Sequence, residues 1–153
     1  MDNEITAYFT DRVPTGWFEG APDVEWDEEE ILCTGMLAST QEVDAFRESS
    51  RADRMTIASE AEARFGRKVS WGVTSRGTTT LFTTQSTPVM SRLRFRERAV
   101  LDTLIDAGVA RSRSEAVSWC VNLVGRHEGE WLDELREALT GVERVRGGGP
   151  TLL

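Results

Sequence analysis

The stretch that decides the fold runs over residues 89–117 and begins Val89-Met90-Ser91-Arg92-Leu93-Arg94-Phe95-Arg96. Arginine alternates here with apolar residues. Because successive side chains of a β-strand point to opposite faces, a strand would place its arginines on one face and Leu93 and Phe95 on the other. A two-stranded β-ribbon is one of the few β structures that fits the major groove of DNA. The candidate base-contacting residues are therefore Arg92, Arg94 and Arg96.

The second half of the stretch predicts the start of a helix. After an apolar helix over about residues 97–107, the chain reads Gly108-Val109-Ala110-Arg111-Ser112-Arg113-Ser114-Glu115-Ala116-Val117. Ser112 is the predicted N-cap, and Glu115 lies three residues on, which is the spacing of a capping box. Free backbone N–H groups at a helix N-terminus bind phosphate. The candidate phosphate contacts are Arg111, Ser112, Arg113 and Ser114.

Strand, helix, glycine turn and capped helix, in this order, resemble the ribbon-helix-helix family of DNA-binding proteins, the Arc/MetJ class. The resemblance covers residues 89–124 and is most specific over residues 107–117, although the proline that members usually place after the strand is absent. It implies a homodimer that pairs the two strands antiparallel and binds double-stranded operator DNA. It also implies that Arg92 and Arg94 read base edges, with Met90 or Arg96 at the margins, while the backbone of residues 112–114 holds a phosphate.

The same residues allow an alternative structure. One helix over residues 91–107, entered at Pro88, would place Leu93, Val100 and Leu104 on one face and give a helix-turn-helix without a ribbon. The ribbon is the structure that we expect. The solvated edge strand, which charge protects from aggregation, is the non-functional explanation of the arginines.

Charge is distributed unevenly along the 153 residues. The net charge is −8. Residues 1–89 carry 16 acidic and 8 basic side chains, whereas residues 90–153 carry 10 of each. The one basic region, residues 90–126, coincides with the arginine motif. This distribution permits local phosphate contact and argues against non-specific coating of nucleic acid.

The predicted fold class is α+β, with a small N-terminal β-α-β-β unit over residues 30–86. Its expected parts are a strand over residues 30–37, a capping box at residues 39–42, a helical region ending at Gly66, and a hairpin whose strands flank residues 75–77.

A ribbon-helix-helix-like dimerisation region follows over residues 87–146. It carries an extra helix whose apolar residues recur at coiled-coil spacing, namely Trp131, Leu135, Ala138, Val142 and Val145. Residues 147–153 form a predicted flexible tail.

Residues 1–29 are predicted to form an irregular, acidic arm that is rich in aromatic residues. The rings are expected to pack on the chain's own domain. The alternatives are that Trp17, Phe18 and Trp26 anchor a protein partner, or that the acidic arm mimics DNA and covers the arginine ribbon.

No enzyme signature, cofactor site or metal site is expected. The acidic run at residues 27–30 is typical of a solvated surface, and the one histidine, His127, lies far from it in sequence. Cys33 and Cys120 lie in apolar patterns and predict buried free thiols. The N-terminal residues lack the features of a signal peptide, so a cytoplasmic location is expected.

The sequence thus predicts a dimeric, sequence-specific transcriptional regulator of bacterial type, with an antitoxin role as a sub-case. The N-terminal domain is a candidate site for a protein partner or a small effector. The alternative is a non-enzymatic interaction or scaffold module whose helical region only dimerises. The two hypotheses differ in whether Arg92 and Arg94 bind DNA.

Overall fold

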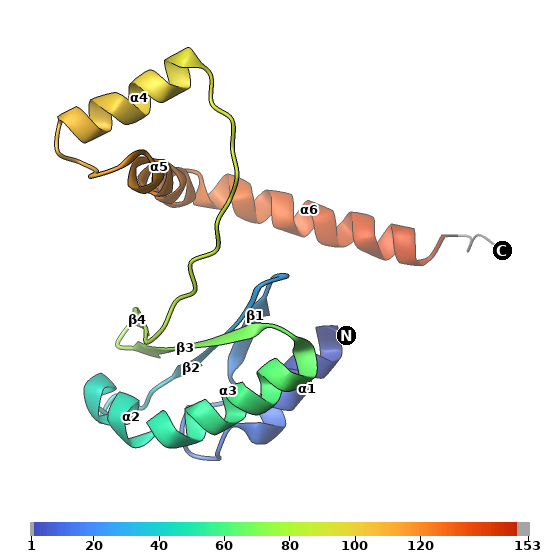
Figure 1. Ribbon diagram of the computed structural model, residues 1–153. Coiled ribbons are helices and arrows are strands. Elements are labelled where there is room, and N and C mark those ends of the chain that lie inside the picture. The colour runs from blue at the N-terminus through green and yellow to red at the C-terminus, as the bar shows by residue number, and fades with distance from the viewer. Residues whose placement is uncertain (1, 150–153) are drawn as a thin grey trace. The chain divides into compact units, whose positions relative to one another are not determined.

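The computed structural model describes residues 2–149, and these divide into two compact units with the boundary between Val89 and Met90 (Figure 1). The N-terminal unit contains a β-sheet and helices, whereas the second unit is helical. The predicted α+β class is confirmed. No helix within residues 2–149 is both long and apolar enough to cross a membrane.

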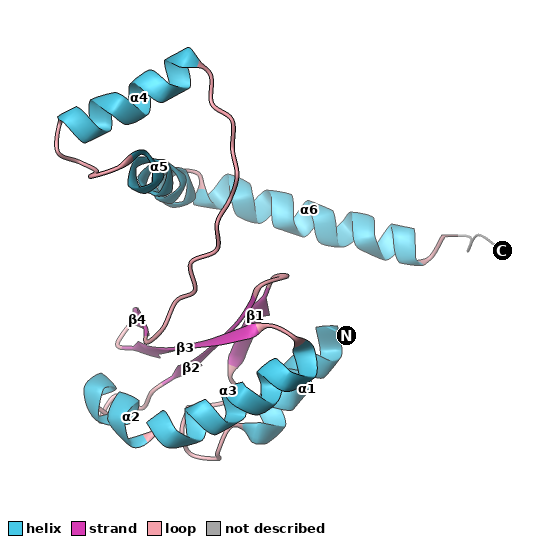
Figure 2. Cartoon of the chain, in the orientation of Figure 1, coloured by secondary structure: helices cyan, strands magenta, loops and turns pink. Residues whose placement is uncertain are grey.

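The sheet of the N-terminal unit has four strands in the order in which they occur along the chain (Figure 2). They are β1 (Asp23–Trp26), β2 (Glu30–Met36), β3 (Lys68–Ser75) and β4 (Thr78–Leu81). The outer pairs, β1 with β2 and β3 with β4, are antiparallel, and the central pair, β2 with β3, is parallel. The predicted strand and hairpin are therefore present, and β1 adds a fourth strand that the sequence did not predict.

Helices α1 (Asp2–Arg12), α2 (Val43–Ser49) and α3 (Arg51–Phe65) lie on one side of this sheet (Figure 1). Helices α2 and α3 form the crossover that a parallel strand pair requires. Gly66 ends α3 in the left-handed conformation with φ +69°, as predicted. The predicted capping box at residues 39–42 is wrong. A turn with a hydrogen bond from Gln41 N to Ala38 O takes its place, and α2 begins at Val43 without a side-chain cap.

The predicted irregular arm at residues 1–29 forms α1 and β1 instead. Ile5 and Phe9 are fully buried in the core of the N-terminal unit, and Tyr8 packs against that core. Ile5, Tyr8 and Phe9 are spaced by three and four residues, which is the pattern of an amphipathic helix. The many acidic residues in this part of the chain made that pattern hard to recognise. Because α1 and β1 belong to the core and the sheet, residues 2–26 are part of the folded N-terminal unit and not a separable arm.

The second unit consists of α4 (Phe95–Asp106), α5 (Arg113–His127) and α6 (Gly129–Gly147). Its buried apolar core is small and contains Leu101, Ala110 and Ala116, with Leu93, Leu104, Ile105, Val117 and Cys120 packed against it. The predicted tail overlaps the end of α6, and its residues 150–153 lie outside the described residues.

The strand predicted at residues 89–96 is not formed in the single chain. Residues 83–94 belong to no helix or strand (Figure 2, pink), and α4 begins at Phe95. Arg96 is therefore a helical residue and does not share a strand face with Arg92 and Arg94. The alternative of one helix from residue 91 is wrong for the same reason. No strand of the described residues lies alongside this segment, so it lacks the ladder hydrogen bonds that define a strand.

Candidate nucleic-acid interface

The C-terminal end of the extended segment is tied to the start of α4. Arg94 is the N-cap residue in an extended conformation, and its backbone N–H donates to Glu97 Oε2 at 2.6 Å. Arg98 Nη1 donates to the carbonyl oxygen of Leu93 at 2.6 Å. Leu93 is half-buried against the helical core, whereas Arg92 and Arg94 are exposed. The segment thus has an anchored apolar residue between two solvent-facing arginines, in the alternation that the sequence predicted.

The backbone before this anchor has no partner. The backbone N–H and C=O groups of residues 86–92 make no hydrogen bond with any of the described residues. Extended backbone with unpaired N–H and C=O groups is the form in which one chain can pair with a strand of another. Val89 and Met90 are 88% and 93% exposed, so their apolar side chains are also uncovered.

The α4–α5 turn has the predicted glycine and cap. Gly108 adopts φ +75°, a conformation that residues with a Cβ rarely adopt. Ser112 is the N-cap of α5, and its Oγ accepts from the backbone N–H of Glu115 at 3.1 Å. The Glu115 carboxylate reaches back to Arg111 N at 2.7 Å, one residue before the position that a capping box predicts.

The two arginines at this helix start are engaged in ion pairs. Arg113 donates to both carboxylate oxygens of Asp102 at 2.9 and 3.0 Å, and Arg111 donates to Glu115 at 3.2 Å. The hydrogen bond from Arg113 lowers the pKa of Asp102, and the one from Arg111 lowers the pKa of Glu115. Each guanidinium group thus has a carboxylate partner at the protein surface.

The hydrogen-bond donors that remain free at the start of α5 are backbone N–H groups. The N–H groups of Arg113 and Ser114 make no hydrogen bond within residues 2–149, because the first bonded groups are those of Glu115 and Ala116. These two donors point out of a helix N-terminus, where the helix dipole favours an anion. The predicted phosphate contacts therefore lie together, with the backbone better placed than the arginine side chains.

The helical unit leaves much apolar surface uncovered. On α4 and α5, Val100 is 54% exposed, Val121 66% and Val124 50%. Helix α6 has no buried residue. Its exposed apolar residues are Trp131, Leu135, Leu139, Val142 and Val145. The predicted stripe of this helix thus exists, and nothing within the described chain covers it.

The aromatic residues proposed as partner anchors are half-buried and pack against the core of the N-terminal unit. Trp17 lies edge-on to Phe46 with ring centroids 5.4 Å apart, and Phe18 packs on the same ring at 5.7 Å. Trp26 is half-buried against the same core. The expectation of intramolecular packing is confirmed, and no protein partner is needed to explain these rings.

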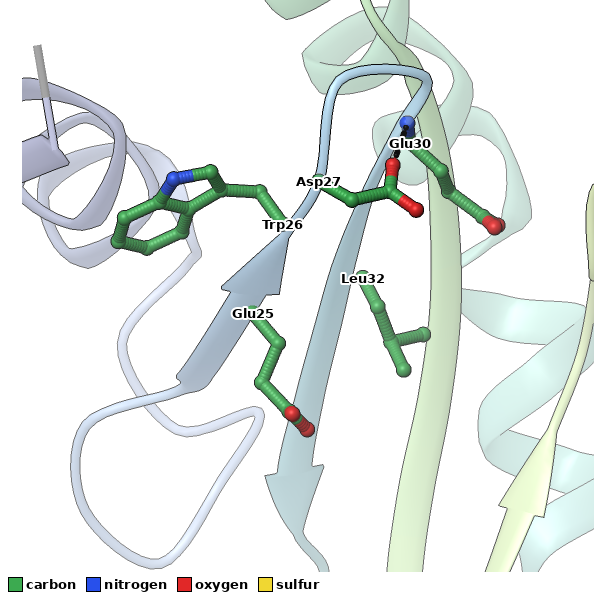
Figure 3. A pocket seen from close by; sticks show the side chains of 5 residues that line it. All are labelled: Glu25, Trp26, Asp27, Glu30 and Leu32. Carbon is green, nitrogen blue, oxygen red and sulfur yellow. Dashed lines mark hydrogen bonds between the residues drawn. The ribbon is translucent and has the colours of Figure 1, made fainter. Parts of the chain in front are cut away.

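The acidic run beside Trp26 stabilises a turn. Asp27 Oδ1 accepts from the backbone N–H groups of Glu29 at 2.8 Å and Glu30 at 2.7 Å, and these bonds lower the pKa of Asp27. Figure 3 shows Asp27 bonded to Glu30 beside a shallow pocket of about 240 Å³, whose other lining residues are Glu25, Trp26 and Leu32. Within residues 2–149 no group of three or more potential ligands is placed to hold a metal ion.

Two residues of this candidate interface, Asp102 and Arg98, were not predicted from the sequence. Asp102 lies eleven positions before Arg113, and no local pattern links them, so only the packing of α4 on α5 brings them together. Arg98 and its bond to Leu93 were also missed. A signal for the true start of α4 was present, since Glu97 lies three residues after Arg94, which is N-capping spacing.

The comparison with known proteins divides the chain near the same place as the structure. Residues 3–81 match the family model described as the Rv1265-like protein N-terminal domain, and residues 94–146 match the Mb1296 C-terminal domain. Over an alignment of 157 residues, the chain is 49% identical to the uncharacterised protein Rv1265 of Mycobacterium tuberculosis strain H37Rv. The alignment covers 95% of this chain and 70% of that relative.

The chain belongs to the Rv1265/Mb1296 family. The Mb1296 protein of Mycobacterium bovis has the same identity and coverage. The two family models leave residues 82–93 unmatched, so Arg94 falls within the C-terminal domain and Arg92 immediately before it. No solved structure matches the chain.

Proposed function

We propose that residues 89–127 form a ribbon-helix-helix-like, homodimeric DNA-binding module of a transcriptional regulator. The extended segment pairs antiparallel with the same segment of a second copy. Its exposed arginines, Arg92 and Arg94, face the major groove. The observation that carries the proposal is this unpaired, arginine-bearing segment directly before α4 and the capped α5.

A second copy of this chain is the partner that best accounts for the unpaired backbone and the exposed apolar residues of the helical unit. Antiparallel pairing of one segment with its own copy satisfies both backbones at once, because the symmetry is self-complementary. The buried core of the helical unit holds only three buried apolar residues among those described, and so small a core needs additional burial. Val100, Val121 and Val124 supply apolar surface on the same helices.

The charges suit recognition of DNA at a defined site. Arginine can donate two hydrogen bonds to the O6 and N7 acceptors of guanine. Neither Arg92 nor Arg94 makes an ion pair with a carboxylate of the described residues, in contrast to Arg111 and Arg113. The backbone N–H groups of Arg113 and Ser114 can hold a phosphate, which positions the module without reading sequence.

The test is selection of binding sites from a random duplex library by the purified full-length chain, followed by affinity measurement on the selected site. The double variant Arg92→Ala, Arg94→Ala is compared with Arg144→Ala, Arg146→Ala, which removes the same charge from the end of α6. Each arginine that contacts a base contributes about 1–3 kcal/mol, so we expect the first variant to lose specific binding and the second to retain it. Recovery of no site by a folded, dimeric protein would refute the proposal.

The second candidate function is an interaction module in which the helical unit only dimerises. Helix α6 favours it, because this helix adds a long uncovered apolar stripe that a ribbon-helix-helix module does not require. Under this alternative, replacing Arg92 and Arg94 changes neither dimerisation nor any binding.

A further inference from the structure

Three arginines converge on one face of the N-terminal unit, far in sequence from the DNA-binding module. Arg47 is in α2, and Arg51 and Arg54 are in the first turn of α3. Ser50 joins the two helices with helical angles of φ −88° and ψ −6°. A spacing of four and then three residues along such a nearly continuous helix places all three side chains on one face.

This face borders a cavity of about 630 Å³ next to the residues that follow β4. A volume of this order is typical of small-molecule sites. The lining residues are Asp44, Arg47, Glu48, Arg51, Arg54, Met55, Phe82 and Thr83. Three arginines and two carboxylates give the lining a net positive charge, and Met55 and Phe82 form its apolar portion.

Arg54 is a buried cation, and no carboxylate of residues 2–149 pairs with it. The residue is only 7% exposed, and its guanidinium lies 4.8 Å from the centre of the Phe82 ring. Nε donates to Ser50 Oγ at 2.9 Å and Nη2 donates to the carbonyl oxygen of Arg47 at 2.8 Å, so both acceptors are neutral. A buried charge is costly unless an opposite charge or strong hydrogen bonds compensate it.

The neighbouring arginines add to this positive charge. Arg47 lies 5.6 Å from the centre of the Phe82 ring and donates to the Phe82 carbonyl oxygen at 3.3 Å. The Arg51 side chain is exposed and makes no hydrogen bond within residues 2–149. Asp44 and Glu48 line the same cavity, yet no carboxylate of the described residues pairs with any of the three arginines. Burial and the charges of Arg47 and Arg51 lower the pKa of Arg54.

We propose that this cavity binds the phosphate group of a small phosphorylated molecule, held by Arg47, Arg51 and Arg54. Arginine suits the task because its planar fork donates two hydrogen bonds to phosphate oxygens. Phe82 and the exposed side chain of Met55 provide apolar contact for the organic part of the ligand.

A small ligand fits better than DNA phosphates. The N-terminal unit has twice as many acidic as basic side chains and carries the whole net charge of −8. Such a unit repels a long polyanion, whereas a compact anion within the cavity meets the local cations first. This inference goes beyond the proposed DNA binding and does not depend on it.

The test is isothermal titration calorimetry on the full-length chain without DNA, using inorganic pyrophosphate, ADP and adenosine as probes. The variants are Arg47→Ala and Arg51→Ala, which leave Arg54 to its structural contacts with Ser50 and α2. The matched control is Arg64→Ala, an exposed arginine farther along α3 that does not line the cavity. A thermal melt of each variant confirms that it is folded.

We expect pyrophosphate and ADP to bind the unmodified chain and adenosine not to bind. Loss of one charge-assisted contact should weaken the binding on the order of tenfold in each cavity variant, with the control unchanged. The proposal is overturned if neither phosphate probe binds, if adenosine binds as well as ADP, or if Arg64→Ala weakens binding as much as the cavity variants. Displacement of ADP by a short DNA duplex would assign the site to DNA phosphates instead and would also overturn it.

Discussion

Arg113 donates from Nε and Nη2 to the two carboxylate oxygens of Asp102, at 2.9 and 3.0 Å, and so ties the first residue of α5 to α4. The pair links the start of α5 to α4, and it also occupies the Arg113 guanidinium, which belongs to one of the two residues with free backbone N–H groups. A residue that stabilises the helical unit therefore opposes the phosphate contact proposed for the same helix start.

Replacing Asp102 by Asn should strengthen DNA binding by the full-length chain. The change removes a negative charge and releases Arg113 to contact phosphate. The affinity should rise severalfold, and the dependence of log K on log salt should steepen by about one unit. Fluorescence anisotropy over a series of salt concentrations measures both quantities. Asp106→Asn removes the same charge one turn farther along α4 and serves as the control. Equal effects of the two variants would show that Arg113 makes no specific contact.

The same pair predicts an acid-sensitive contact between α4 and α5. Because Arg113 lowers the pKa of Asp102, the pair contributes stability that is present above the ordinary carboxyl pKa of 3.8 and is lost as the pH falls through the lowered value. The thermal midpoint followed by circular dichroism should therefore fall less between pH 6 and pH 3 in Asp102→Asn than in the unmodified chain. A decrease of the same size in both would contradict this role.

Gly35 is required by the packing of Phe18. A Cβ atom at this position of β2 would overlap the Phe18 ring, which itself packs on Phe46. We expect Gly35→Ala to lower the free energy of unfolding by about 1–3 kcal/mol, measured by urea denaturation, because the ring must move within a packed core.

Gly125 in α5 provides the contrasting substitution. A Cβ atom there meets no atom within 4 Å. Alanine is favoured over glycine inside a helix, so Gly125→Ala should raise the stability by about 0.5–1 kcal/mol. If Gly35→Ala proved as stable as the unmodified chain, the close contact with Phe18 would be disproved.

The Cys33 thiol should be unreactive in the folded protein. Cys33 is fully buried in the core, and burial, with a smaller effect from Asp23, raises the pKa of its thiol to about 12. We expect the half-buried Cys120 to react with Ellman's reagent at pH 8 and Cys33 to react only after unfolding. Rapid modification of both thiols under native conditions would contradict the burial.

The raised pKa of Cys33 also has a consequence for stability. Because the fold favours the neutral thiol, the stability that it contributes is fully present below the ordinary pKa of 9.0 and is lost as the pH rises toward about 12. In urea denaturation at pH 8 and pH 10.5, Cys33→Ala should show a smaller decrease with pH than the unmodified chain.

The stripe on α6 should contribute to association of two copies. Leu135→Glu places a charge within the exposed apolar stripe, whereas Thr140→Glu places the same charge on the opposite face of the helix. Light scattering coupled to size-exclusion chromatography should show a weakened dimer for the first variant and an unchanged one for the second. A monomer in all three proteins would refute the second copy as the occupant of these surfaces.

Much of the local structure could be predicted from the sequence. The strand at β2, the glycine cap of α3, the hairpin of β3 and β4, and the Ser112 cap of α5 each depend on a few adjacent residues with a clear pattern. Helix α1 had such a pattern as well, in Ile5, Tyr8 and Phe9, but the segment was predicted to be irregular because of its acidic residues.

The site residues were predictable only where the pattern was local. Arg92 and Arg94 flank an anchored Leu93 as the alternation indicated, yet the sequence alone could not place the start of α4, so Arg96 was assigned to the wrong element. The spacing of Arg47, Arg51 and Arg54 was visible in the sequence. The burial of Arg54, and the contacts of Arg47 and Arg54 with the Phe82 ring after β4, were not.

By itself the sequence determined the class of fold, the alternation of arginines before α4 and the apolar stripe of α6, because periodicity and capping act over a few residues. The tertiary structure alone showed that α1 and β1 complete the N-terminal core, that Asp102 pairs with Arg113, and that Arg54 is buried with no paired carboxylate among the described residues. These facts depend on contacts between residues that are far apart in the sequence. Burial and charge pairing arise from such contacts and cannot be read from a single segment.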